Sequence, residues 1–215
     1  MANRVSSEHQ TDRGIVRRRA FLETALNVFS ERGYAGVNVN EIVQQAGGSL
    51  ATLYAQFGSK DGLFVAVLEE CNARFAAALC PVADPELPLA KGLQRIGEHY
   101  LHEALSARSR RFFRMIAAAS GEFPDAAREC LRVGPNRVAQ VVADYIEARA
   151  VKERLVFADA RETALAFFAL VRGPHHYCAV LDDDYVLSDL ELHAHVAKAV
   201  SILMSGAIQG GPQHG

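Results

Sequence analysis

Apolar residues recur at helical spacing along almost the whole chain. From Phe21 to Phe29 they follow the i, i+1, i+4, i+5, i+8 pattern that places side chains on one face of a helix. The spacing returns from Leu63 to Cys71, from Val138 to Ile146 and from Leu192 to Leu203. Alternating runs of β-branched residues between turn residues, which indicate strands, are nearly absent. The pattern predicts an all-α protein.

Glycine and proline divide these stretches unevenly. Between Arg32 and Lys60 five glycines enclose two very short helical stretches, whereas the stretches after Asp61 are longer. We therefore expect a compact helix-turn-helix domain over residues 12–62 and a larger helical domain over residues 63–206. Residues 1–11 and 207–215 are expected to be flexible tails.

The densest local signals lie between residues 38 and 60. Asn38 stands three residues before Glu41, close to the arrangement of a capping box, and Gly47-Gly48 can end the helix that follows. Ser49 can cap the next helix, over about residues 49–56. A short helix, a glycine turn and a second short helix form a helix-turn-helix, whose second helix lies in the major groove of DNA.

Polar side chains on this second helix suit DNA. Hydroxyl and amide groups that can reach phosphates or base edges are carried by Ser49, Thr52, Tyr54 and Gln56. Lys60 follows at the start of the next helix, where its charge and the free N–H groups could hold a phosphate.

Charge is distributed unevenly around a net −2. That total excludes a wholly basic nucleic-acid binder but allows a local basic patch. Arg13, Arg17, Arg18 and Arg19 crowd the entry to the first helix. Positive charge is unfavourable at a helix N-terminus, so we interpret this cluster, and Arg17 and Arg18 in particular, as contacts to DNA phosphates.

Other classes of protein find little support. No stretch is long and apolar enough to span a membrane, and the polar N-terminus is unlike a secretory signal, so we expect a cytoplasmic protein. The four cysteines form no CxxC pair, and the histidines lack partners at metal-ligand spacing. Phosphate-loop, dinucleotide and nucleophile-elbow motifs are absent, so we expect no metal, no cofactor and no enzymatic activity.

The residues from Ala46 to Phe64, Ala-Gly-Gly-Ser-Leu-Ala-Thr-Leu-Tyr-Ala-Gln-Phe-Gly-Ser-Lys-Asp-Gly-Leu-Phe, resemble the DNA-binding domain of the tetracycline-repressor (TetR) family. The upstream stretch from Ala25 to Tyr34 is similar at the correct distance, and together the resemblance covers roughly residues 17–68. It implies a dimeric repressor that binds a pseudo-palindromic operator in double-stranded DNA. A small effector, bound in the C-terminal domain, would release the operator.

Carried over by position, the resemblance implies that Thr52 and Tyr54 contact DNA, with Tyr54 and Lys60 on phosphates. Asn38 would cap its helix and touch the DNA backbone. The sequence departs from the family at Gly48, where an apolar residue commonly packs the turn, so a looser turn is expected. It departs again at Leu50 and Ala55, and Leu50 or Ala51 would then contact thymine methyl groups.

The second domain offers two further candidate sites. A largely apolar effector would bind among aromatic and histidine side chains: Phe75, Tyr100, Phe112, Met115, Phe123, Tyr145, Phe168, His175 and His176. The last two long helices, over about residues 161–170 and 189–205, are expected to form the dimer interface through Ala164, Leu165, Phe168, Leu192, Val196, Val200 and Leu203.

Two alternatives remain open from the sequence. An all-α enzyme is one, because residues distant in the chain can form a catalytic site that no local motif reveals. A DNA-binding dimer controlled by a protein partner is the other.

Overall fold

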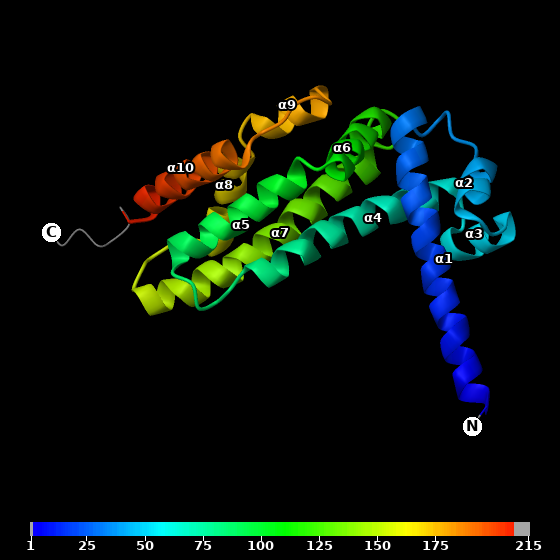
Figure 1. Cartoon of the computed structure of the whole chain (residues 1–215), viewed down its shortest axis with the longest axis horizontal. Coiled ribbons are helices and arrows are strands. Elements are labelled where there is room, and N and C mark those ends of the chain that lie inside the picture. Colours follow the sequence, from blue (N-terminus) through cyan, green and yellow to red (C-terminus); the bar gives the residue numbers. More distant parts are fainter. Residues whose placement is uncertain (1, 209–215) are drawn as a thin grey trace. The chain divides into compact units, whose positions relative to one another are not determined.

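The computed structural model describes the backbone of residues 2–208 and the side chains of residues 14–206, and within that range it contains helices and no strand (Figure 1). The elements are α1 (Ala2–Arg32), α2 (Val39–Ala46), α3 (Leu50–Phe57), α4 (Lys60–Leu79), the short 3-10 helix η1 (Cys80–Val82), α5 (Leu89–Ala104), α6 (Ala107–Ala119), α7 (Pro124–Glu153), α8 (Ala160–Arg172), α9 (His175–Leu181) and α10 (Asp189–Ile208). The predicted all-α class is confirmed. Of the segments expected as flexible tails, residues 2–11 belong to α1 and residues 207–208 to α10, whereas residues 1 and 209–215 lie outside the described residues.

Side-chain caps begin several of the helices. The carboxamide oxygen of Asn38 accepts the N–H of Asn40 at 2.9 Å before α2, and the hydroxyl of Ser49 accepts the N–H of Thr52 at 3.1 Å before α3. Asp159 accepts two backbone N–H groups at the start of α8. Each cap satisfies an N–H group that the first turn of a helix otherwise leaves without a partner, which is why these helices start where they do.

The helices pack into two units, each with its own core. The first, here called the head, comprises the residues up to Cys71 together with Arg111–Cys130. The second, the body, comprises Asn72–Arg110 and the residues from Leu131 onward. The division therefore falls inside α4, α6 and α7, and not at the boundary near residue 62 that the glycine pattern suggests.

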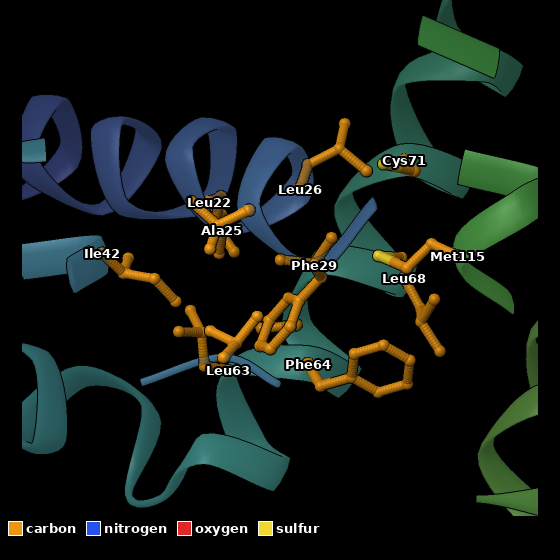
Figure 2. Packing of buried hydrophobic residues seen from close by; sticks show 14 of the residues in the cluster. Leu22, Ala25, Leu26, Phe29, Ile42, Leu63, Phe64, Leu68, Cys71 and Met115 are labelled. Carbon is orange, nitrogen blue, oxygen red and sulfur yellow. The ribbon is translucent and has the colours of Figure 1, made fainter. Parts of the chain in front are cut away.

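The core of the head explains this division. Figure 2 shows side chains of α1, α2 and α4 converging, among them Phe29, Ile42 and Phe64, with Met115 of α6 beside Leu68. Leu63 and Phe64 are fully or almost fully buried in this core although they follow the expected boundary. Burial of each such side chain contributes roughly 1.5–3 kcal/mol, so the first turns of α4 are part of the head.

In the body, α5, α8 and α10 pack closely against one another. A Cβ atom added at Gly97 of α5 would lie 2.6 Å from Val196 of α10 and 3.1 Å from Phe167 of α8. Val196 and Phe167 are fully buried. The absent side chain of Gly97 thus allows three helices to meet at one point.

Candidate nucleic-acid interface and effector region

The turn between α2 and α3 depends on two glycines. Gly47 and Gly48 have φ angles of 73° and 113°, in the left-handed region that side chains disfavour. A Cβ atom at Gly48 would lie 3.0 Å from the Phe21 ring, so this glycine also allows α1 to approach closely. Side chains of α1 fill the space that an apolar side chain at position 48 would occupy, so the packing gives no reason for the looser turn expected from the sequence.

Arg17 closes the same turn. Its Nη1 atom donates a hydrogen bond to the carbonyl oxygen of Ala46, the last residue of α2, at 3.1 Å. A Cβ atom at Gly47 would lie 2.9 Å from that nitrogen. Arg17 therefore supplies a donor to one of the carbonyl groups that the end of a helix leaves unpaired.

Two other cations predicted to bind phosphates lie over aromatic rings of the head. The guanidinium of Arg18 is 4.6 Å from the centre of the Phe57 ring at the end of α3. The Lys60 ammonium is 4.4 Å from the centre of the Tyr34 ring. These contacts hold both cations beside the helix-turn-helix.

Tyr34 is a feature that the sequence pattern did not single out. Its hydroxyl donates to the carboxylate of Asp61, and its ring centre lies 4.2 Å from that of Phe123, the residue immediately before α7. Burial, together with this hydrogen bond, holds the pKa of the Tyr34 hydroxyl well above its usual range. The residue thus connects the beginning of α4 with the α6–α7 connection inside the head.

The outer face of α3 carries most of the predicted base-reading residues. Ser49, Ala51 and Thr52 are exposed, and Tyr54 is 45% exposed. Leu50 differs, because it is half-buried against the core of the head and has less surface for thymine methyl groups. Gln56 is also half-buried, and its amide oxygen is buried without a hydrogen-bond partner.

The predicted effector residues separate into different places. Phe112, Met115 and Phe123 pack in the core of the head. Tyr145 packs in the body, where its hydroxyl donates to the carbonyl of Leu87 at 2.9 Å. These four residues do not join the aromatic group around Tyr100 because tertiary packing, which the helical pattern does not specify, takes them elsewhere.

The remaining effector residues form two clusters in the body. Tyr100 contacts Phe75 and Phe168, with ring centres 5.3 and 4.4 Å away. His176 is buried, and burial, reinforced by the charge of Arg172, lowers its pKa to about 4. His175 lies in another cluster: its Nδ1 atom is 2.6 Å from the Tyr185 hydroxyl, and its ring centre is 4.3 Å from that of His195.

Arg172, which the sequence pattern did not suggest, contacts the first of these clusters. Its Nε and Nη2 atoms donate to the Tyr100 hydroxyl at 3.2 and 3.0 Å. The two residues are 72 positions apart in the chain. A basic residue in the last turn of a helix ordinarily indicates only a favourable interaction with the helix dipole, so nothing local distinguished this one.

Most residues predicted at the dimer interface lie in the body's own core. Ala164, Phe168, Leu192, Val196 and Val200 are buried within the single chain, and only Leu165 and Leu203 are half-buried. The buried five retain little surface for a second chain, because the apolar stripe of each helix faces α5 and its other neighbours.

Small residues are among the exposed positions of α8 and α10, together with charged residues such as Arg161 and Lys198. Ala166, Ala169, Ala194, Ala197 and Ser201 are exposed there. Beside them lies a hollow of about 530 Å³, lined by Val156, Phe157, Ala158, Glu162, Thr163, Ala166, Leu170, Ile202, Leu203 and Gly206.

The described residues offer neither a membrane-spanning helix nor a metal-binding cluster. In the described part of the chain no helix is both long and apolar enough to cross a membrane. Among the same residues no three side chains of the metal-binding types are grouped so as to hold an ion.

Comparison with protein families gives matches along most of the chain. Residues 21–67 match the family of bacterial regulatory proteins, tetR family, and residues 91–206 match the C-terminal domain of AefR-like transcriptional repressors. The family matches thus correspond to regulators rather than to enzymes.

Individual proteins agree with the family matches. The chain is 32% identical over 131 residues to the HTH-type transcriptional repressor NicS of Pseudomonas putida. The aligned region covers 53% of this chain and 60% of that repressor. A TetR-family regulator from Mesorhizobium loti superposes with a TM-score of 0.81 at 21% identity, over 90% of this chain and 98% of the other. The flavonoid-responsive regulator FrrA superposes with a TM-score of 0.68 at 26% identity, over 91% and 98%.

Because the C-terminal match alone spans more than half of the chain, and the helix-turn-helix match precedes it, the protein belongs to the TetR family of DNA-binding transcriptional regulators.

Proposed function

We propose that the protein is a dimeric repressor that binds a pseudo-palindromic operator and is released from it by a small effector. The observation that carries this proposal is the α2–glycine turn–α3 unit, with both helices capped and with the polar face of α3 exposed. An α-helix of this kind fits the major groove of B-DNA, where the pattern of donors and acceptors distinguishes all four base pairs.

Within this proposal, base edges are read by Thr52, with Ala51 placed for contact with a thymine methyl group. Tyr54, Lys60 and Arg18 contact phosphates. Exposure of Thr52, Ala51 and Tyr54 on one helix supports these roles. Ser49 and Asn38 each use one side-chain oxygen as a helix cap, so their remaining polar atoms are available for the DNA backbone.

The dimer is proposed to form through the outer face of α8 and α10, defined by Ala166, Ala169, Ala194, Ala197 and Ile202. Small side chains allow helices of two subunits to approach closely, and 49% of the Ile202 side chain is exposed. A second copy would cover the adjacent hollow, which is lined mainly by apolar residues. A twofold axis would then repeat α3 about one turn of DNA away, roughly 34–36 Å.

Control by a small molecule is proposed for the body. One neighbour in fold is named flavonoid-responsive, which supports small-molecule control of this architecture. An effector that binds one conformation more tightly than the DNA-binding conformation shifts the population away from the operator. The protein would act in the cytoplasm, where its operator is accessible.

Selection of bound sequences from random duplex DNA tests the proposal. A consensus with twofold symmetry is the expected result. Random recovery of sequences, or a consensus without symmetry, would contradict a dimer that reads a pseudo-palindrome. Sedimentation of the free protein at micromolar concentration gives the oligomeric state independently.

A further inference from the structure

Arg172 places a positive charge beside the aromatic group of the body. The neighbouring side chains are buried: Tyr100 is 5% exposed, His176 is 5% exposed and Phe168 is 4% exposed. The guanidinium of Arg172 therefore has little water on the side that faces them. Arg172 itself is half-buried. Charges in such positions are ordinarily paired, because burial removes part of their hydration.

The groups around this guanidinium do not neutralise it. Both of its hydrogen bonds go to the hydroxyl of Tyr100, and among the described side chains no carboxylate lies within 4.0 Å of it. His176 adds no negative charge, and its pKa of about 4 leaves it neutral at pH 7. The carbonyl groups at the end of α8 supply only a partial negative charge.

The hydrogen bonds between Arg172 and Tyr100 leave N–H and O–H donors of both residues without an acceptor among the described residues. Because the Tyr100 oxygen accepts from Arg172, the hydroxyl hydrogen points away from the guanidinium, and the described residues include no acceptor bonded to it. A group that accepts and does not donate would satisfy this hydrogen and the spare N–H groups of Arg172 together. A carboxylate meets this requirement and also supplies the missing charge.

We infer that Arg172 and Tyr100 bind the carboxylate of an organic acid whose apolar part lies against Phe75 and Phe168. This inference rests on the proposed function, because it names the chemical class of the effector in the body. The aromatic side chains favour an aromatic or unsaturated hydrocarbon part, since ring contacts add to the burial of apolar surface.

Isothermal titration calorimetry of the full chain tests the inference with pairs of compounds that differ only in charge. The probes are benzoate, phenylacetate and 3-phenylpropionate, each compared with its primary amide. The amide keeps the shape of the acid but loses its charge and one acceptor. We expect at least one acid to bind about tenfold or more tightly than its amide.

Three variants assign that preference to a residue. Arg172→Gln is expected to abolish the preference for the acid, whereas Arg172→Lys retains charge and therefore part of it. Tyr100→Phe is expected to lower the affinity for the acid by about tenfold and to leave the affinity for the amide nearly unchanged. Arg161→Gln is the matched control, because Arg161 is an exposed arginine in the first turn of the same helix.

Each alternative outcome has a definite meaning. Equal binding of acid and amide, retention of the preference by Arg172→Gln, or no binding of any acid at millimolar concentration overturns the inference. Thermal melting followed by circular dichroism shows whether each variant is folded. If Arg172→Gln is unfolded, Arg172→Lys takes its place in the comparison of acid and amide binding. The assay contains no DNA, so its failure leaves the operator selection, and with it the regulator proposal, unaffected.

Discussion

Arg17 of α1 donates a hydrogen bond to the carbonyl oxygen of Ala46, at the end of α2 and 29 residues away. The same side chain lies against both glycines of the turn that precedes α3. Arg17 therefore stabilises the turn that precedes α3. This contact accounts for the position of its side chain without the phosphate contact that its charge suggested.

Replacement of Arg17 by Ala is expected to lower the free energy of unfolding of the protein by about 1 kcal/mol, through loss of one hydrogen bond. A residue that braces the turn and does not contact phosphate should leave the salt dependence of DNA binding unchanged. Chemical denaturation and binding measured over a range of salt concentrations check both effects. A flatter salt dependence, by about 0.9 in the log–log slope, would instead assign Arg17 to a phosphate.

Arg19→Ala is the matched control for the stability measurement alone, because Arg19 is an exposed arginine on the same helix, two residues away, and belongs to the cluster interpreted as phosphate contacts. It should leave stability within about 0.5 kcal/mol of the unchanged protein.

Replacement of Gly48 by Ala is expected to destabilise the head by about 2 kcal/mol. A φ of 113° is strained for a residue with a Cβ atom, and that atom would lie 3.0 Å from Phe21. Gly14→Ala makes the same change in an exposed part of α1 where nothing lies within 4 Å, and should stabilise by up to about 1 kcal/mol. Thermal melting gives the stability of both variants. A Gly48→Ala variant that melts at the same temperature as the Gly14→Ala variant would refute a tightly packed turn.

Replacement of Ile202 by Glu is expected to produce monomers, because it places a charge on the proposed face of α8 and α10. Affinity for a palindromic operator should fall with it, since the two recognition helices would no longer be linked. Val151→Glu makes the same kind of change at an 82% exposed position of α7 and should leave the dimer intact. Sedimentation velocity distinguishes them, and a dimer that persists in the Ile202 variant argues for another interface.

Stability is expected to depend on His176 at acidic pH. Its pKa is about 4 in the folded protein and 6.5 in its ordinary state, so the unfolded chain binds the proton more strongly. Stability therefore falls as the pH decreases from about 6.5 to about 4, by on the order of 3 kcal/mol when the change is complete. Unfolding at several pH values, compared with His176→Gln, isolates this contribution; parallel profiles for the two proteins would contradict it.

The sequence by itself determined the local features. Helical periodicity gave the all-α class, and the residue types at Asn38, Ser49 and the glycines marked where the short helices begin and end. These features depend on neighbours a few positions apart, so a single sequence contains the information that specifies them. The resemblance of residues 17–68 to the TetR family rested on the same local pattern.

Only the tertiary structure decided which residues meet across the chain. An apolar stripe shows that a helix face is covered, but not by which partner. Phe112 and Phe123 consequently lie in the core of the head, and Val196 packs inside one chain although it was expected between two. Arg172 meets Tyr100 for the same reason: their contact depends on how α8 packs against α5, which no spacing within either helix specifies.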